Sequence, residues 1–293
     1  MSNIVISGSI AYDLVMNFPG KFKDHILPDK INKLSVGLVV NKPTENFGGT
    51  AANIAYNLSL IKENPIILGI VGNDFGKYEK HFKKNKINTS YIKKNKTGKT
   101  ANAYIITDQN NNQITSYYAG ENDVKYCQIV KTIKNIKLAI VSPDSIDMMN
   151  EYIRLYQSLN IPYIFDPGQQ TTCFTAQNLK KAISKSQILI CNEYEIKLIL
   201  NKLKIKISSL LKLLSVLIIT KGGNGSEIYV ENEKIKIPAH EVKKAVNPTG
   251  AGDAYRAGLI HGLINQWSWK KTGKLASFLA ARVVKTNLTQ VKL

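Results

Sequence analysis

The segment 247–260, NPTGAGDAYRAGLI, places glycines around one acidic residue and continues into an apolar, alanine-rich pattern. Glycines allow the backbone of Gly250, Ala251 and Gly252 to approach an anion, and a helix beginning there directs free N–H groups and its positive dipole end toward it. A carboxylate beside phosphate is unfavourable unless it accepts the proton of an attacking hydroxyl. The segment therefore predicts phosphoryl transfer with Asp253 as the base. The alternative is that Asp253 only complements the helix dipole.

A second glycine pair lies near the N-terminus, in FGGTAANIAYN at 47–57. Gly48 and Gly49 permit close approach of a ligand, and Asn53 lies about one helical turn further on the same side. In GSIAYD, Asp13 follows the first expected strand, where its two acceptor oxygens could hold two neighbouring sugar hydroxyls. The alternatives are a tight helix start for the glycines and a turn for Asp13.

Two further motifs follow expected strands in the C-terminal half. NEYE, at 192–195, has the form of a capping box in which Asn192 and Glu195 bind helix N–H groups. The alternative is a contact with Mg²⁺ or phosphate at the same helix start. TKGGNG, at 220–225, joins two strands with more glycines than a hairpin turn needs, which suggests a nucleotide against the backbone.

Two other patterns exclude common nucleotide sites. TGKT at 97–100 resembles the end of a P-loop, but that motif requires glycine where this chain has Lys93. TGAGDA is not G-x-G-x-x-G and lies near the C-terminus rather than after the first strand. A P-loop nucleotide site and a dehydrogenase are therefore not expected.

Short apolar runs alternate with helical patterns, as in parallel strands joined by crossover helices. We expect strands at 3–9, 65–72, 137–143, 162–168, 187–192 and 215–223. We expect helices at 50–63, 147–160, 178–186, 193–203, 250–265 and 268–286.

Two segments, 14–47 and 99–119, alternate apolar and polar residues, and the second has a polar turn at 110–112. They predict a small antiparallel β lid inserted into the α/β domain. Its aromatic residues either lie over a ligand or only hold the lid together; they are Phe18, Phe22, Tyr104, Tyr117 and Tyr118.

The composition fits one α/β domain, residues 1–293, with the lid as an appendage. The chain has no apolar stretch of about 20 residues and no signal-peptide pattern at its start, so we expect a cytoplasmic protein without a membrane partner. Three scattered cysteines favour neither disulfides nor zinc. Of 40 basic residues only Arg154, Arg256 and Arg282 are arginines, so the net charge of +19 indicates a solvated lysine surface without a specific nucleic-acid partner.

Five motifs follow one another along the chain: FGGTAANIA, GNDFG (72–76), NEYE, TKGGNG and NPTGAGDAYRAGL. Their order and spacing resemble those of the ribokinase-like (phosphofructokinase B) family of carbohydrate and nucleoside kinases. The resemblance extends along nearly the whole chain. It implies a three-layer α/β/α fold with a mostly parallel central sheet and a small antiparallel β lid, ATP as donor, and Mg²⁺.

The resemblance also implies roles for individual residues. Asp253 would be the catalytic base and Gly250, Ala251 and Gly252 the anion hole. The substrate would contact Asp13, Gly48, Gly49 and Asn53. The nucleotide would be bordered by Asn192, Thr220, Gly222 and Gly225, and Glu195 would act on Mg²⁺ through water. Asn247 and Pro248 stand where the family usually has an acidic residue and threonine in a segment that often helps hold a monovalent cation. Asn247 keeps a side-chain oxygen but not the charge, so the resemblance leaves potassium (K⁺) activation open.

Within the family, GSIAYDLVMNFPGKF and its lid segment look most like bacterial adenosine kinase-like members. The expected function is ATP-dependent phosphorylation of the primary 5′-hydroxyl of a nucleoside, with adenosine as the expected substrate, as in purine salvage. The alternatives are a sugar or sugar-phosphate kinase on the same scaffold, and a sensor that binds nucleosides without turnover, against which the intact GAGD argues. The protein is expected to act as a monomer or homodimer.

Overall fold

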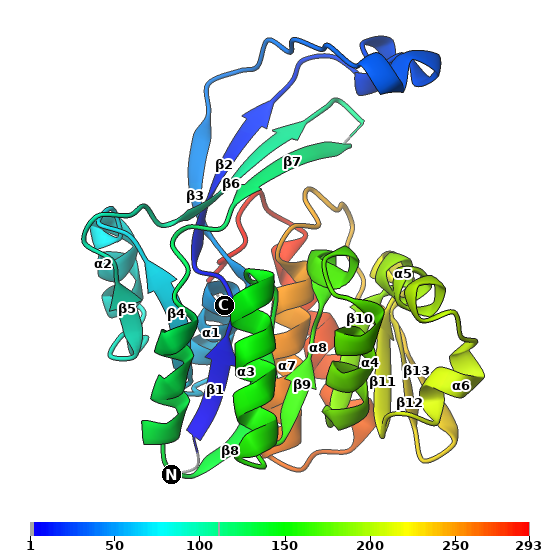
Figure 1. Ribbon diagram of the computed structural model, residues 1–293. Coiled ribbons are helices and arrows are strands. Elements are labelled where there is room, and N and C mark those ends of the chain that lie inside the picture. Colours follow the sequence, from blue (N-terminus) through cyan, green and yellow to red (C-terminus); the bar gives the residue numbers. More distant parts are fainter. Residues whose placement is uncertain (1–2, 111, 293) are drawn as a thin grey trace.

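The chain folds around a large central sheet. The structure is a computed structural model that describes residues 3–110 and 112–292. Within these residues nine strands form the sheet, in the order β13-β12-β11-β10-β9-β8-β1-β4-β5 (Figure 1). All pairings from β5 to β11 are parallel, and β11–β12 and β12–β13 are antiparallel. Its strands are β1 (Asn3–Ser7), β4 (Ile66–Val71), β5 (Ile92–Lys94), β8 (Ile136–Val141), β9 (Tyr163–Phe165), β10 (Ile188–Asn192), β11 (Val216–Thr220), β12 (Ser226–Val230) and β13 (Glu233–Ile237).

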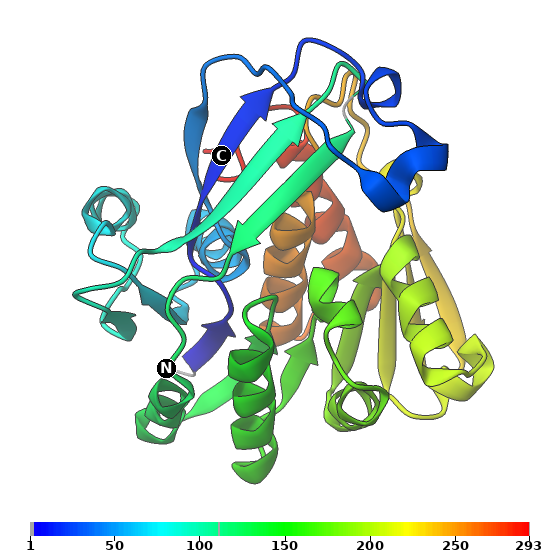
Figure 2. The same cartoon turned by 45° about the horizontal axis from the view of Figure 1, so that its top comes forward.

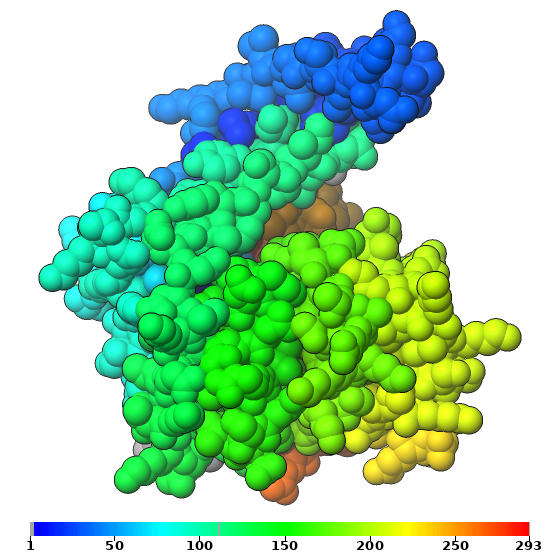
Figure 3. Space-filling view, in the orientation of Figure 1, coloured from blue at the N-terminus to red at the C-terminus, as the bar shows by residue number. Residues whose placement is uncertain are grey.

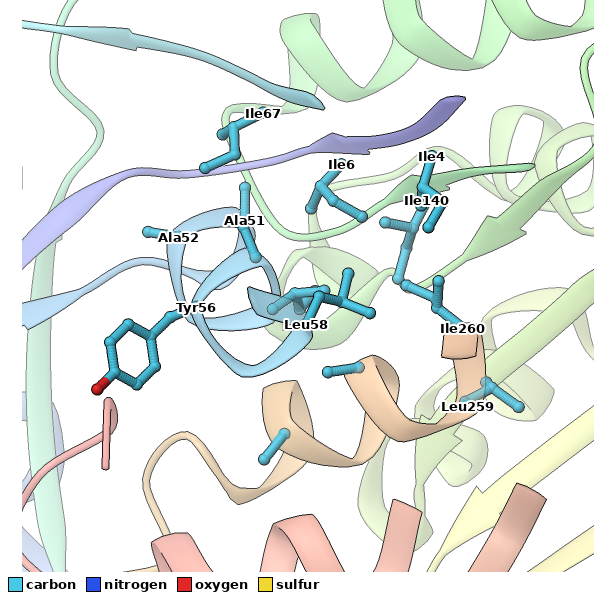
Figure 4. Packing of buried hydrophobic residues seen from close by; sticks show 14 of the residues in the cluster. Ile4, Ile6, Ala51, Ala52, Tyr56, Leu58, Ile67, Ile140, Leu259 and Ile260 are labelled. Carbon is cyan, nitrogen blue, oxygen red and sulfur yellow. The ribbon is translucent and has the colours of Figure 1, made fainter. Parts of the chain in front are cut away.

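Helices cover both faces of the sheet, so the central strands are buried on both sides. Along β1, Ile4 and Ile6 pack into one core and Val5 into the other, because successive side chains of a strand point to opposite faces. Figure 4 shows the first core, where Ile4, Ile6 and Ile140 lie near residues of α1 and α7. The helices are α1 (Thr50–Leu60), α2 (Gly76–Lys84), α3 (Ile146–Ser158), α4 (Ala176–Lys185), α5 (Glu193–Leu203), α6 (Ile207–Leu211), α7 (Ala251–Ile264) and α8 (Trp269–Val283).

The expected three-layer α/β/α architecture is confirmed, and each expected strand and helix has a counterpart. The strands are shorter than expected, most clearly β9 and β11, where a proline and positive-φ glycines interrupt the extended chain: β9 ends at Phe165 before Pro167, and β11 ends at Thr220 before Gly222. Short 3₁₀ helices complete the chain: η1 (Phe22–Asp24), η2 (Pro28–Lys33), η3 (Val124–Thr132), η4 (Gly168–Thr172) and η5 (Gly222–Asn224).

The lid is a separate four-stranded sheet that stands over the carboxyl ends of the parallel strands (Figure 2). Its strands are β2 (Ala11–Asn17), β3 (Thr44–Gly48), β6 (Ala101–Thr107) and β7 (Gln113–Tyr118), in the order β3-β2-β6-β7. The pairs β2–β3 and β6–β7 are antiparallel, as expected of hairpins, and the central pair β2–β6 is parallel. The space-filling view shows a recess between the lid and the domain (Figure 3).

The expectation of continuous alternation over 14–47 was wrong in its middle part. Between β2 and β3 the described chain forms η1, η2 and irregular backbone. Pro19, Gly20 and Pro28 explain the break, because proline removes a ladder donor and glycine weakens a strand. In the turn expected at 110–112, Asn111 lies outside the described residues.

In the described ranges, every helix is too short or too polar to cross a membrane.

Candidate active site

Packing of α1 against α7 brings the two glycine-rich motifs together. Small buried alanines, among them Ala51, Ala55 and Ala254, allow the helices to approach closely. At their N-terminal ends the Asn53 amide Nδ2 donates a hydrogen bond of 2.8 Å to Asp253 Oδ2, across 200 residues of sequence. The expected substrate residue and the expected base therefore lie in one site.

The start of α7 has the geometry of an anion hole. Gly250 caps the helix in the left-handed region, with φ at 81°, and no side chain caps the helix. A Cβ on Gly250 would lie 2.8 Å from the Cβ of Thr289, so a larger residue does not fit. Among the described residues nothing accepts hydrogen bonds from the amides of Gly252 and Asp253, which leaves both free for an anion at the positive end of the helix.

Asp253 is placed to act as a base near neutral pH. Burial raises the pKa of its carboxyl to about 7, against the lowering by Arg256 and by the Asn53 hydrogen bond, while Asp166 and Asp13 add to the rise. A general base is most effective when its pKa lies close to the working pH.

Asp13 is a buried carboxylate that accepts no hydrogen bond from the described residues. It is 7% exposed, and burial raises its pKa to about 7. The neighbouring glycines make room for it and for the turn into α1: a Cβ on Gly48 would lie 2.2 Å from the Asp13 carboxylate, and a Cβ on Gly49, where φ is 88°, would lie 2.5 Å from the backbone N of Ala11. An unpartnered buried carboxylate is costly, so its place here indicates a ligand with hydroxyl donors.

A buried ion pair lies under the anion hole, and neither of its residues was among those expected in the site. Arg256 contacts both carboxylate oxygens of Asp166, 90 residues away, and its Nη1 donates to the Gly252 carbonyl at 2.9 Å. Both side chains are almost fully buried. The bidentate pair fixes the first turn of α7 and places a positive charge next to the anion hole. The sequence feature that could have pointed to Arg256 was the rarity of arginine in this lysine-rich chain.

Asn192 and Glu195 form the capping box that the sequence allowed. Asn192 Oδ1 accepts from the amides of Tyr194 at 2.9 Å and Glu195 at 2.8 Å, and Glu195 Oε2 accepts from the Asn192 amide at 2.8 Å. Burial raises the pKa of Glu195, Asp166 adds to the rise, and Arg256 opposes it. Glu195 therefore lies close to the buried ion pair.

A cleft of about 510 Å³ lies beside the glycine-rich turn after β11. Its size suits a nucleotide, since small-molecule sites are commonly several hundred Å³. Thr220 ends β11, and Gly222 and Gly225 take positive φ values of 53° and 83° in the turn. Gly225 also has a structural requirement, because a Cβ there would lie 2.0 Å from the Ile237 carbonyl oxygen. The cleft is lined by Glu193, Lys221, Asn224, Ser226, Glu227, Lys236, Ile237 and Pro238.

The lid aromatics divide into three groups. Phe18 and Phe22 are buried and stack on each other with ring centroids 6.0 Å apart, so they hold the lid together. Tyr104 and Tyr118 are 43% exposed. Tyr117 is in register with Ala103, which is in register with Asp13, so Tyr117 shares the Asp13 face of the lid.

Tyr117 lies on the Asp13 face of the lid, near Ser9 and Asp144. Its hydroxyl is buried without a hydrogen-bond partner in the described structure. Burial raises its pKa far above the usual value and the charges of Asp144 and Asp13 act in the same direction, whereas the nearby Ser9 hydroxyl opposes the rise. Asp144 is also buried, with its pKa raised to about 7 by burial, and it accepts only from the Ser145 amide at 2.7 Å.

The donor set suits a metal that is held mainly by phosphate and water. No group of three His, Cys, Asp or Glu side chains occurs in the part of the chain that the structure describes. Mg²⁺ in phosphoryl-transfer enzymes needs one or two carboxylates and fills its other positions with phosphate and water oxygens. Glu195, with Oε1 without a described partner, fits that requirement. Asn247 Oδ1 already accepts from the Thr249 amide at 2.9 Å.

A base of raised pKa beside a helix-start anion hole, at the carboxyl edge of a mostly parallel sheet, defines a phosphotransferase with an alcohol group as acceptor. The sequence pattern of the pfkB family of carbohydrate kinases matches residues 1–293, and the chain belongs to this family.

Individual relatives are similar over the whole chain. A nucleoside kinase from Methanocaldococcus jannaschii is 28% identical over 295 residues, which cover 100% of this chain and 94% of the relative. The structure of the Burkholderia thailandensis nucleoside kinase in complex with inosine matches with a TM-score of 0.91 at 32% identity, covering 99% of this chain and 93% of that chain. Its ADP–inosine complex matches with a TM-score of 0.89 at 33% identity, covering 99% and 91%.

Proposed function

We propose that this protein is an ATP-dependent nucleoside kinase that phosphorylates the primary 5′-hydroxyl. The observation that carries the proposal is the pair of buried carboxylates with pKa values raised to about 7: Asp253 beside the anion hole and the unpartnered Asp13 on the lid. One carboxylate suits the reacting hydroxyl and the other suits two neighbouring hydroxyls of a ribose. Nucleoside kinases among its relatives support this assignment.

In the proposed mechanism the 5′-hydroxyl donates its proton to Asp253, whose Oδ2 is held by Asn53. The hydroxyl oxygen forms a bond to the γ-phosphorus as the bond from that phosphorus to the β-phosphate oxygen breaks, which yields the nucleoside 5′-phosphate, ADP and a proton. The amides of Gly252 and Asp253 stabilise the charge on the transferred group. Arg256 holds the Gly252 carbonyl, so the amides are aligned before reaction.

ATP is proposed to lie along the cleft beside the β11 turn, bordered by Asn192, Thr220, Gly222 and Gly225, with its γ-phosphate at the start of α7. Glu195 would hold Mg²⁺ through water, and the ion neutralises charge on the phosphate oxygens when bound. Lys221 lines the cleft and already pairs with Glu227 at 3.0 Å and Glu193 at 3.8 Å, so a bound nucleotide would share its positive charge with these carboxylates.

Adenosine is the proposed nucleoside. The Tyr117 hydroxyl, on the Asp13 face of the lid, and the buried Asp144 carboxylate both have spare hydrogen-bonding capacity, which suits a base with N–H groups. The adenine 6-amino group supplies such donors, and the N1–H of inosine supplies one. A free sugar carries no base that could pair with these groups, so both would stay unpaired, which costs affinity.

The test is kcat/KM, measured by coupled ADP release, for adenosine, inosine, guanosine, cytidine, 2′-deoxyadenosine, ribose, fructose and fructose 6-phosphate. Adenosine should be the best substrate, and 2′-deoxyadenosine should lose about 1 to 3 kcal/mol, roughly 5- to 150-fold, because one Asp13 hydrogen bond is lost. A free sugar or sugar phosphate with the highest value would establish the sugar-kinase alternative. Nucleoside binding without ADP release would establish the sensor.

We further propose that the protein works in the cytoplasm, where ATP is available, and that a monomer or homodimer is active. Cys127, Cys173 and Cys191 are free thiols, as is usual in a reducing compartment.

A further inference from the structure

The C-terminal segment reaches into the active site through two buried side chains. Thr289 Oγ1 donates to the Phe47 carbonyl at 2.7 Å, and the Thr289 side chain covers Gly250. Gln290 is 8% exposed and lies 237 residues from Asn53, to which it is hydrogen-bonded. Residues 289 and 290 thus lie between the substrate glycines and the anion hole.

Gln290 is the centre of a hydrogen-bond network. Its Nε2 donates to Asn53 Oδ1 at 3.1 Å and to the Tyr78 hydroxyl at 2.7 Å. Asn53 Nδ2 donates to Asp253 Oδ2, and the Tyr78 hydroxyl donates to the Gly48 carbonyl at 2.7 Å. His81 Nε2 lies 2.7 Å from Gln290 Oε1.

The partners fix the direction of every bond in this network. An ionised Asp253 only accepts, so the end of Asn53 that faces it must be the NH₂ group, and Oδ1 must face Gln290. The Gln290 end that meets Asn53 must then be its NH₂ group, and its Oε1 must accept from a protonated His81 Nε2. His81 meets this requirement as a neutral ring with the proton on Nε2, and burial lowers its pKa.

We propose that Gln290 is a positioning residue for the kinase reaction: it orients the Asn53 amide as a donor to Asp253 and links that contact to Gly48 through Tyr78. The proposal rests on the proposed function in that Asp253 is the base. Without the Gln290 NH₂ group, no described residue donates to Asn53 Oδ1, and the amide can rotate to place oxygen against carboxylate.

The other groups that face Asp253 do not involve Gln290 directly, apart from Tyr78. Arg256 on its own helix lowers the pKa of Asp253, and Asp166 after β9 and Asp13 on the lid raise it. Asp253 in turn contributes to the raised pKa of Tyr78 on α2, which keeps that hydroxyl neutral. A change at Gln290 therefore reaches Asp253 mainly through Asn53.

The experiment compares pH profiles of kcat/KM from pH 5.5 to 9.5 for the wild type, Gln290→Leu and Gln290→Glu, with the best acceptor of the substrate panel and ATP. Loss of the Asn53 donor should raise the pKa of Asp253, so the acid limb of the profile, where kcat/KM falls with falling pH, should move upward by about one pH unit. Activity should then fall about tenfold at pH 6 and less than twofold at pH 9. The isosteric Gln290→Glu should move the limb at least as far, because a carboxylate cannot donate to Asn53 Oδ1.

Gln157→Leu is the matched control, because Gln157 Nε2, on α3, also donates to a tyrosine hydroxyl, that of Tyr163 at 3.1 Å, and neither residue contributes to the pKa of Asp253. Its acid limb should coincide with that of the wild type. In the double variant Gln290→Leu, Asn53→Ala, the Gln290 substitution should add nothing to the effect of Asn53→Ala, because it acts through that side chain.

An acid limb that stays in place in both Gln290 variants would overturn the inference, whether activity is unchanged or falls equally at every pH. Additive effects in the double variant would do the same. Failure of the proposed function is distinct, because it appears as wild-type protein that prefers a sugar or turns over nothing.

Discussion

We propose that the buried Asp13 carboxylate binds the substrate and destabilises the folded protein when no substrate is present. The variant Asp13→Asn tests this directly. The pKa of Asp13 is raised from 3.8 to about 7, a shift of about 3 units, which corresponds to about 4 kcal/mol. Because the folded-state pKa lies above the unfolded value, the folded state binds the proton more tightly. The destabilisation is therefore absent below about pH 4, grows as the pH rises to 7, and is complete above 7.

Asparagine at position 13 removes the charge but retains polar atoms that also lack partners. We expect the variant to be about 2 to 4 kcal/mol more stable than the wild type at pH 8, with little difference at pH 4. Unfolding entropy is about 2.1 cal/mol/K per residue. For 293 residues the gain corresponds to a rise in Tm of about 3 to 6 °C.

The assay is thermal or urea unfolding of both proteins at pH 4.5, 6 and 8 without ligand, together with kcat/KM for the best nucleoside. The variant should lose about 10- to 100-fold in kcat/KM, because ribose hydroxyls lose a charged acceptor. Asp147→Asn, a change in the first turn of α3, is the control for a general effect of removing a negative charge. If the variant is less stable than the wild type at pH 8, or if its gain in stability does not depend on pH, then the ionised Asp13 carboxylate does not destabilise the folded protein.

Three further outcomes are expected. Asp253→Asn should lower kcat by about 10² to 10⁴ with nearly unchanged ADP affinity by calorimetry, and near-normal turnover would refute its role as base. Arg256→Met should destabilise the fold by about 3 to 5 kcal/mol in urea unfolding, because Asp166 is left buried and unpaired. The double variant Asp166→Leu, Arg256→Met should recover most of that stability without recovering activity. A double variant as unstable as Arg256→Met would contradict the ion-pair explanation. Exchange of K⁺ for Na⁺ should change kcat less than about twofold, because Asn247 offers no charge to a cation and its side-chain oxygen already accepts from the Thr249 amide. Strong activation by K⁺ would show that another group holds the ion.

The chemical features that depend on neighbouring residues could be predicted from the sequence. The glycines before Asp253, the capping box at Asn192 and the alternation of strands and helices are local patterns, because a helix start, a turn or a strand face is decided within a few residues. Parallel strands then place residues after their carboxyl ends at one edge of the sheet. That rule accounts for the position expected for Asp13 after the first strand, whereas Asp253 was expected from the glycine motif at the start of its helix.

Tertiary structure decided the partners of these residues. Arg256 meets Asp166 only because α7 packs behind β9, and Gln290 meets Asn53 only because the chain returns across α1 after α8. The parallel β2–β6 pair, which turns Tyr117 to the Asp13 face, joins strands that are separated by a large part of the domain. No local pattern encodes such contacts, because they arise from the packing of whole elements. The pKa values of Asp13 and Asp253 follow from the same packing, since burial and distant charges set them rather than their neighbours in the chain.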